Sequence, residues 1–404
     1  GGLLDDTPDN DDGGAVADDP DVAVQSGIDL SGTVTSGADE DVTWAWADDL
    51  TGLALPSNLK SAGDPITWAI NGAGDLAAIA TDGDSNEREV LTVSLTSGGI
   101  AVVTLKDQFD HSGGNNDEEQ LPLDLSAALL ATDADGDTVV PGTGSFVVNV
   151  ENDLPVADDA ATPITASVQE DALDEADGTD DDQSTGLPDD GSDTDEASGA
   201  DGGADDLTTL FKSGADAPLT VSLVQDDAAV TADDLLPGLT SDGDALSYSV
   251  SGDTLTATAG GRTIFTLVVN GDGSWSFDLD DQIDHKLVAT NPDDSTLLDD
   301  GGDGISGIDF SPVLIGTDKD GDFVTGAEAG SFVISIENDV PEDSGSDVTV
   351  FVAEDGLLGG LLDDTPDNDD GGAVADDPDV AVQSGIDLSG TVTSGADEDV
   401  TWAW

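Results

Sequence analysis

The feature that most limits how this chain can fold is its repetition. Residues 1–46 recur without change as residues 359–404, so the sequence has a period of 358 residues. Such a chain is expected to fold as an array of modules, each with its own core, rather than around one large core. Identity over a stretch of this length also indicates recent duplication in a long array. That organisation suits a spacer, and we predict that the protein is not an enzyme.

A second, weaker repeat lies inside this period. Four motifs occur twice in the same order: Leu105–His111 and Leu279–His285, Thr132–Asp137 and Thr317–Asp322, Ser145–Pro155 and Ser331–Pro341, and Val168–Asp171 and Val352–Asp355. Two diverged modules therefore alternate along the chain. We predict a first repeat over residues 1–155 with a truncated start, a second over 156–341, and the beginning of a third over 342–404.

Apolar residues alternate with polar or small ones along many short segments. Examples are Val42, Trp44 and Trp46; Phe146, Val148 and Val150; and their counterparts Phe332, Ile334 and Ile336. This period of two, interrupted by Gly, Asp and Asn, is typical of antiparallel strands with one buried face. The longest helix candidate covers only Leu125 to Leu130. The sequence thus predicts an all-β protein of tandem antiparallel β-sandwich modules, Ig-like in their Greek-key connections, with long acidic calcium-binding loops.

The balance of charge excludes several classes of partner. The chain has 91 Asp or Glu, 7 Lys or Arg and no Cys, for a formal net charge of -84. Without Cys there can be no disulfide and no thiolate metal site. Seven scattered cations cannot neutralise a run of phosphates, so a nucleic-acid partner is not expected. No apolar run is long enough to span a membrane.

The kind of acid matters as much as its amount. Only 14 of the 91 acids are Glu, which leaves 77 Asp, and Gly contributes 50 residues. Asp reaches a cation from a tight turn, and Gly supplies the positive φ that such turns need. We therefore predict Ca²⁺ as the cofactor, with several ions per module. The dense acidic segments at residues 1–21 and 171–206 are either solvated and disordered or folded around cations, and the sequence leaves both readings open.

Two tight turns carry carboxylates at alternate positions. They contain Asp133, Asp135 and Asp137 in one copy, and Asp318, Asp320 and Asp322 in the other. This spacing can point three side chains at one centre, as the first half of an EF-hand loop does. The rest of that loop is missing, because its twelfth position would be Gly144 or Ala329. We predict cation sites whose remaining ligands come from elsewhere in the fold; the alternative is a solvated turn.

Each module ends in a polar cluster that follows a strong strand and precedes a proline. The first cluster is Glu151, Asn152 and Asp153, and the second is Glu337, Asn338 and Asp339. We predict that they bind a cation at the module boundary, the first together with Glu170 and Asp171, the second with Glu354 and Asp355. An ion at this place would stiffen a joint that otherwise bends freely. The alternative is a polar strand exit.

Both histidines of the chain, His111 and His285, end the motif Asp-Gln-x-Asp-His. A hydrolytic interpretation would make each a base oriented by the preceding Asp110 or Asp284, but no nucleophile recurs beside them. We favour a local hydrogen bond at a strand end. Asp107 and Asp281, in the same motif, are further candidates for cation binding.

Taken in order, these motifs resemble the repeat modules of giant RTX adhesins, the type I-secreted, biofilm-associated surface proteins of Gram-negative bacteria. The resemblance covers both complete modules and the start of the third. It implies calcium-stiffened extender repeats that project a distal ligand-binding domain from the bacterial cell surface. It also implies an extracellular location, neighbouring repeats of the same chain as partners, and a monomeric chain.

A second function stays open from the sequence. A calcium-dependent, lectin-like module would combine carboxylates with an exposed tryptophan. Trp44 and Trp46 are the candidates, but their alternation places both on the same face as Val42, which favours a place in the core.

Overall fold

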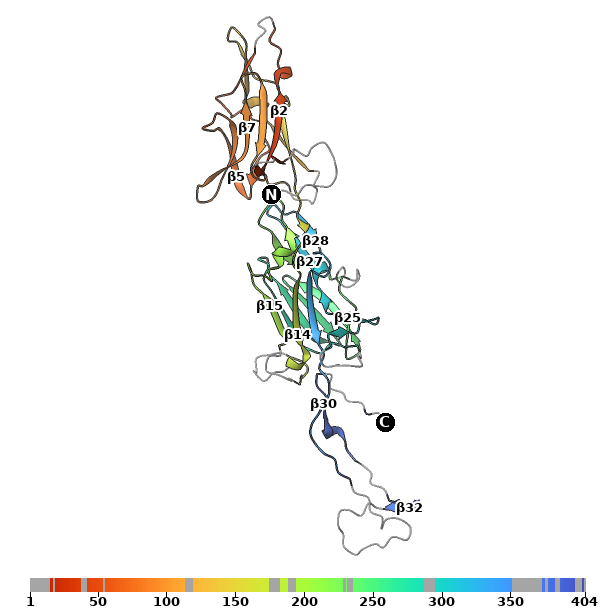
Figure 1. The fold of residues 1–404 in the computed structure, drawn as a ribbon. Helices are drawn as coiled ribbons and strands as arrows, with labels where there is room; N and C mark the ends of the chain where they lie inside the picture. Colours follow the sequence, from red (N-terminus) through yellow and green to blue (C-terminus); the bar gives the residue numbers. More distant parts are fainter. Residues whose placement is uncertain are drawn as a thin grey trace.

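A computed structural model describes residues 15–16, 19–37, 42–53, 55–112, 119–173, 182–187, 194–227, 230, 235–286, 295–350, 373–374, 377–381, 386–396 and 402. These residues form mainly β-strands joined by tight turns, which confirms the all-β class (Figure 1). Two of the predicted site residues, Glu354 and Asp355, lie outside the described residues, as do most of the first acidic segment and part of the second.

The first hydrophobic core is formed by a seven-stranded antiparallel sheet and two smaller sheets. The large sheet has the order β1-β2-β8-β7-β6-β5-β4. Its strands are β1 (Ala15–Val16), β2 (Asp19–Asp29), β4 (Lys60–Ser61), β5 (Asp64–Ile70), β6 (Leu76–Thr81), β7 (Glu87–Leu95) and β8 (Ile100–Leu105). The small sheets join β3 (Thr43–Trp46) to β10 (Leu129–Thr132) and β11 (Thr138–Val139), and β9 (Gln120–Asp124) to β12 (Val147–Glu151). Their inward residues, such as Trp44 and Leu129, share one cluster with Leu76 and Leu91.

The predicted helix candidate in the first module is wrong in extent. The chain makes a single 3-10 turn, η2 (Ser126–Ala128), and then enters β10 at Leu129. A similar turn, η1 (Ser31–Thr33), follows β2. A segment of six residues is too short to hold a helix without strong packing, whereas Leu129 and Ala131 gain burial by pairing with β3.

The second core contains the same central strand order. The sheet β15-β23-β22-β21-β20 follows the order of β2-β8-β7-β6-β5 in the first core. Its strands are β15 (Glu196–Gly199), β20 (Ser247–Ser251), β21 (Thr254–Ala259), β22 (Arg262–Val269) and β23 (Trp275–Leu279). Aromatic rings fill the centre, and Phe310 lies 5.9 Å from both Phe265 and Phe332 between ring centroids.

Smaller sheets complete the second core. They are β13 (Val156–Ala157) with β16 (Phe211–Lys212); β14 (Ile164–Gln169) with β29 (Phe332–Glu337) and β26 (Ile308–Asp309); β17 (Thr220–Leu223) with β27 (Leu314–Thr317) and β28 (Phe323–Thr325); β18 (Thr240–Ser241) with β19 (Asp244–Ala245); and β24 (Leu297–Leu298) with β25 (Ile305–Ser306). Short 3-10 turns are η3 (Glu170–Ala172), η4 (Leu207–Leu210) and η5 (Ser311–Val313).

One strand pair departs from the predicted antiparallel pattern. β14 and β29 run parallel, with Ile164 beside Phe332 and Gln169 beside Glu337. Parallel neighbours need a long crossover, and here almost the whole second module lies between them. Residues Phe332, Ile334 and Ile336 of β29 are fully buried and alternate with half-buried ones, as period two predicts.

The C-terminal segment continues the array with short strand pairs. β30 (Glu342–Asp343) pairs with β33 (Val392–Thr393), β31 (Ala373–Val374) pairs with β32 (Asp377–Ala381), and η7 (Ser389–Thr391) precedes β33. Figure 1 shows the first core, the second core and this segment following one another along an elongated molecule. The candidate functional sites therefore lie at the boundaries where one part of the molecule meets the next.

Candidate cation site at the joint between the two cores

The two Asp turns have the same backbone. Asp318 Oδ1 accepts hydrogen bonds from the N–H groups of Gly321 and Asp322 at 3.1 and 2.9 Å, and Asp133 Oδ1 accepts from Gly136 and Asp137 at 3.1 and 2.8 Å. Gly321 and Gly136 have φ of 108° and 101°, a conformation that requires glycine. In each turn three carboxylate oxygens lie within 4.8 Å of one another. Both turns could therefore hold a cation, as their spacing predicts.

The surroundings of the two turns differ. Asp318 and Asp322 are buried, at 5% and 0% exposure, whereas Asp135 and Asp137 are exposed. The second turn is buried because the end of the first module covers it. Asn152 Nδ2 donates to Asp322 Oδ2 at 2.7 Å, and the backbone N–H of His111 donates to Asp320 Oδ2 at 2.8 Å.

The structure thus joins two motifs that the sequence suggested as separate sites. Asn152 and Asp153, from the end of the first module, lie at the Asp turn of the second. Asp153 Oδ2 accepts from the N–H of Ala215 at 2.6 Å, so it also contacts the second module. The joint is made of acidic oxygens from both sides.

One central residue of this joint was missed by the sequence reasoning. Asp216 is 2% exposed, and its Oδ1 has no hydrogen-bond partner. It belongs to the motif Ser-Gly-Ala-Asp, which occurs at Ser36–Asp39, Ser213–Asp216 and Ser394–Asp397. This threefold recurrence is a signal that could have identified it.

The charge at the joint is concentrated and poorly solvated. Burial is the main cause that raises the pKa of Asp216, to about 8. The remaining causes are the negative charges of Asp320, Asp318, Asp153 and Asp110. Burial, followed by the adjacent Asp320, likewise raises the pKa of Asp318 to about 7, and burial raises that of Asp110. Each shift shows that these carboxylates are costly to ionise together unless positive charge is supplied.

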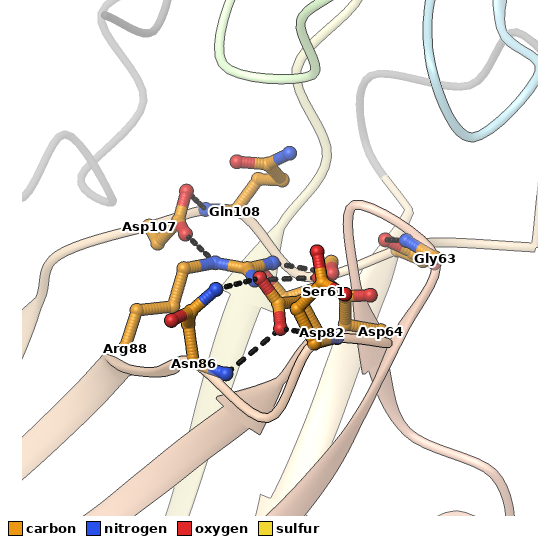
Figure 2. Close-up of polar contacts among 10 residues, drawn as sticks. Ser61, Gly63, Asp64, Asp82, Asn86, Arg88, Asp107 and Gln108 are labelled. Carbon is orange, nitrogen blue, oxygen red and sulfur yellow. Dashed lines mark hydrogen bonds and ion pairs between the residues drawn. The ribbon is translucent and has the colours of Figure 1, made fainter.

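The loop that reaches the joint from the first module is held by an arginine. Figure 2 shows Arg88 between Asp64 and Asp107, with 2.6 Å from Nη1 and Nε to the respective Oδ2 atoms. Arg88 Nη2 also donates to the backbone oxygen of Ser61 at 2.5 Å. Arg262 pairs with Asp281 in the same way in the second module. Asp107 and Asp281 are therefore engaged by arginine, which gives them a structural role that the sequence did not show.

The following acid of the same motif faces the joint. Asp110 accepts from the N–H of Gly63 at 3.0 Å, and Asp284 accepts from Gly243 at 3.0 Å. The turn after β4 or β18 thus fixes each Asp on its own module. Asp110 then lies close enough to Asp216 and Asp320 to affect their charge, or be affected by it.

The two histidines join this loop to the last strand of their module. His111 places Nδ1 3.0 Å from the oxygen of Phe109 and Nε2 3.2 Å from that of Val150. His285 repeats the arrangement with Ile283 at 2.8 Å and Ile336 at 3.1 Å. These backbone contacts are the local hydrogen bonds that we favoured. Burial lowers the pKa of His285.

The predicted grouping of Glu170 and Asp171 with the first module's end is wrong in position. β14 separates them from Asn152 and Asp153, and they lie instead at the far end of the second module. There Glu170, fully buried, accepts from the N–H of Ile283 at 2.7 Å and of Asp339 at 3.3 Å. The parallel pairing of β14 with β29 causes this, because it carries Glu170 to the end where β29 exits.

The far end of the second module repeats the joint with the next part of the chain. Asp339 Oδ2 accepts from the N–H of Ala396 at 2.7 Å, as Asp153 does from Ala215. Asp339 is 2% exposed and burial raises its pKa. The neighbouring Asn338 donates from its backbone to Ser295. Glu337 and Glu151 are half-buried and end β29 and β12, where they pair with Gln169 and Gln120.

The donor set at the first joint fits a hard divalent cation. It consists of carboxylate and amide oxygens, and three of the buried ones have no hydrogen-bond partner: Asp216 Oδ1, Asp318 Oδ2 and Asp320 Oδ1. Calcium takes six to eight oxygen ligands in flexible geometry, which this crowded cluster can supply. At the first module's turn, only the three carboxylates come together in the described residues.

Comparison of the sequence with protein-family models gave no match, and comparison with curated proteins gave none either. In the part of the chain that the structure describes, no helix has the length and apolar character to cross a membrane. Trp44 is 5% exposed and packs in the first core, and the half-buried Trp46 packs against the same core, in line with the core placement that their alternation favours.

Proposed function

We propose that the chain is a calcium-stiffened spacer, whose consecutive modules are locked together by cations bound between them. The observation that most directly supports this proposal is the cluster of acidic and amide side chains at the first joint. The second module contributes Asp216, Asp318, Asp320 and Asp322, and the first contributes Asn152, Asp153 and Asp110. A bound Ca²⁺ would supply the positive charge that this cluster needs.

The side chains at the joint favour an open arrangement of the two modules without a cation and a closed arrangement with one. Without a cation, the ionised carboxylates on the two modules repel each other and favour an open, bending joint. Their arrangement around one centre favours a closed joint once the charge is balanced. The contacts of Asp153 with Ala215 and of Asn152 with Asp322 then fix the direction in which the modules point.

The finer fold also belongs to this proposal. We infer that each module is an Ig-like β-sandwich. Two or more sheets contribute buried residues to each core, and the large sheets of the two cores share a strand order, which supports this inference. The resemblance to RTX adhesin repeats supports an extracellular place at a bacterial surface, where a stiff stalk holds a distal binding domain away from the cell.

Small-angle scattering with calcium and with chelator tests the spacer. We expect a longer maximum dimension and less flexibility with calcium. Profiles that superimpose while strand content is unchanged would contradict the stiffening. Asp320→Ala should remove most of the calcium response of the joint. Asp135→Ala is the matched control, because it alters the equivalent turn that no other module covers in the described structure.

A further inference from the structure

The glutamine of the motif Asp-Gln-x-Asp-His reaches across the joint. In the first module this residue is Gln108, whose side chain extends away from Arg88 (Figure 2). One orientation of its amide gives both ends of the side chain a suitable partner. In that orientation Nε2 donates to the backbone oxygen of Ala215, at 3.3 Å, and to Asp107 Oδ1. Gln108 therefore makes one hydrogen bond within its own module and one to the next.

The first module thus holds both polar backbone groups of a single residue. The N–H of Ala215 donates to Asp153 Oδ2 at 2.6 Å, and its backbone oxygen accepts from Gln108. Gly214, which precedes it, has a φ of 66°, a conformation that favours glycine. These two hydrogen bonds recognise the main chain of Ala215 and not its side chain.

Gln108 is fixed by hydrogen bonds that start in the first core. Arg88 Nε, on β7, donates to Asp107 Oδ2 at 2.6 Å. Asp107 Oδ1 accepts from the backbone N–H of Gln108 at 3.1 Å, and also from its side-chain amide. A donor that is already held in place loses little conformational freedom when it binds. The amide of Gln108 is therefore prepared for the second module.

The second module carries the same arrangement at its far end. Asp281 Oδ1 accepts from the backbone N–H of Gln282 at 3.0 Å, and Arg262 pairs with Asp281. Gln282 is 4% exposed, and among the described residues its Oε1 has no hydrogen-bond partner. Exchanging the two ends of this amide, as at Gln108, turns a donor toward that place. The repeat thus predicts that Gln282 makes the equivalent contact at the second joint.

The segment received at the two joints is the same, although its flanks differ. Ser-Gly-Ala-Asp follows Phe-Lys at residues 213–216 and Val-Thr at residues 394–397. At the second joint the N–H of Ala396 donates to Asp339 Oδ2 at 2.7 Å. Ala396 is 1% exposed and belongs to the hydrophobic cluster of the second core. A contact through the backbone of a shared segment does not depend on the residues that precede it.

We propose that the glutamine and the strand-exit aspartate at the end of each module form a latch for the main chain of the Ser-Gly-Ala-Asp segment that follows. The latch is Gln108 with Asp153 at the first joint and Gln282 with Asp339 at the second. Its partner is a glycine of positive φ followed by a residue with a free N–H and C=O, from a module of either type. Gln108 and Gln282 are positioning residues. The latch rests on the joints of the proposed spacer but uses hydrogen bonds instead of a cation.

Hydrogen exchange of the full chain, followed by mass spectrometry, tests the latch. Gln108→Met removes the amide donor and keeps a side chain of similar length. We expect exchange in the fragment that contains residues 213–216 to become faster by about three- to tenfold, which corresponds to the loss of one hydrogen bond. Gln120→Met is the matched control, because Gln120 is an exposed glutamine of β9 in the same module. Strands β6 to β8 should exchange at the parent rate in both variants.

Gln282→Met provides the reciprocal test. It should accelerate exchange around Ala396 and leave residues 213–216 at the parent rate. Each variant is compared with the parent in saturating calcium and in chelator. The difference between variant and parent tests the latch, whereas the difference between calcium and chelator tests the stiffening, so either can fail alone. Unchanged exchange at residues 213–216 in Gln108→Met with calcium would overturn the latch, as would an equal acceleration by Gln120→Met or one that extends over β6 to β8.

Discussion

At the scale of single residues, the joint depends on the close contact between a glycine of one module and the carboxylate of an aspartate of the other. Gly214 has φ of 66°, and a Cβ built on it would lie 2.3 Å from Asp153 Oδ2. Gly395 repeats this against Asp339, at 2.4 Å. Gly37, in the third copy of the motif, has φ of 73° but nothing within 4 Å. All three glycines thus have a positive φ, but only the two at the joints, Gly214 and Gly395, lie close to an aspartate carboxylate.

Gly214→Ala should therefore open the first joint, since Asp153 has to leave its place beside Ala215. Gly37→Ala is the control, because it carries a similar cost of positive φ, about 1 kcal/mol, without the collision. We expect Gly214→Ala to lower the apparent calcium affinity and increase flexibility in scattering. Equal effects of the two variants would show that the strain is local and that the contact with Asp153 matters little.

Asp216→Asn tests the buried charge directly. Above pH 8, where Asp216 is ionised despite the burial that raises its pKa to about 8, the change keeps the shape and removes one negative charge from the site. In chelator we expect the variant to have a higher melting temperature than the parent, because less repulsion remains. A gain of about 1 kcal/mol in the free energy of unfolding would raise the melting temperature by a few degrees. In calcium we expect the order to reverse, because one ligand charge is lost. Differential scanning calorimetry under both conditions measures this crossing, and the same order in both would argue against a cation at Asp216.

At the scale of elements, the joint is positioned by loops anchored within each core. Arg88, on β7, ties the turn after β4 to the loop that begins at Asp107 (Figure 2). The same loop carries Asp110 and His111. Arg262, on β22, does the same for the far end of the second module. A planar guanidinium holds two carboxylates and a carbonyl in a fixed geometry with five donors, whereas an ammonium has three donors on a flexible stem.

Arg88→Lys should accordingly weaken calcium binding at the first joint and destabilise the first module by roughly 1–2 kcal/mol. Arg262→Lys should destabilise the second module and leave the first joint unchanged. Calcium titration calorimetry combined with thermal melting separates the two effects. A loss of first-joint affinity in both variants would mean that the anchors are not independent.

At the scale of the whole molecule, the excess of acid makes stability depend on pH in a direction set by the joint. The pKa of Asp216 and of Asp318 is raised in the folded state, to about 8 and about 7, above the 3.8 of an ordinary Asp. A raised carboxyl pKa contributes stability that is complete below the unfolded pKa and is lost as pH rises through the folded pKa.

In chelator we therefore expect the melting temperature to fall as pH rises from about 4 to about 8. In saturating calcium this fall should be largely abolished, because the cation favours the ionised form of the same groups. Melting curves across this window, with and without calcium, provide the measurement. A fall of equal size in both conditions would mean that the joint carboxylates do not share a cation.

The repeat, the all-β class and the two Asp turns could be predicted from the sequence because they rest on short-range rules. Period two fixes which side chains of β29 face inward, and the Asp-x-Asp-Gly-Asp spacing fixes the turn at Asp318 through bonds within five residues. The tertiary structure alone decided which groups meet. Asn152 reaches Asp322 over 170 positions, and Glu170 reaches Asp339 over 169. The parallel crossover of β14 sends Glu170 to one end of the module and leaves Asn152 at the other. Such contacts arise when segments far apart in the sequence pack together, and no local sequence pattern specifies which distant residues will meet.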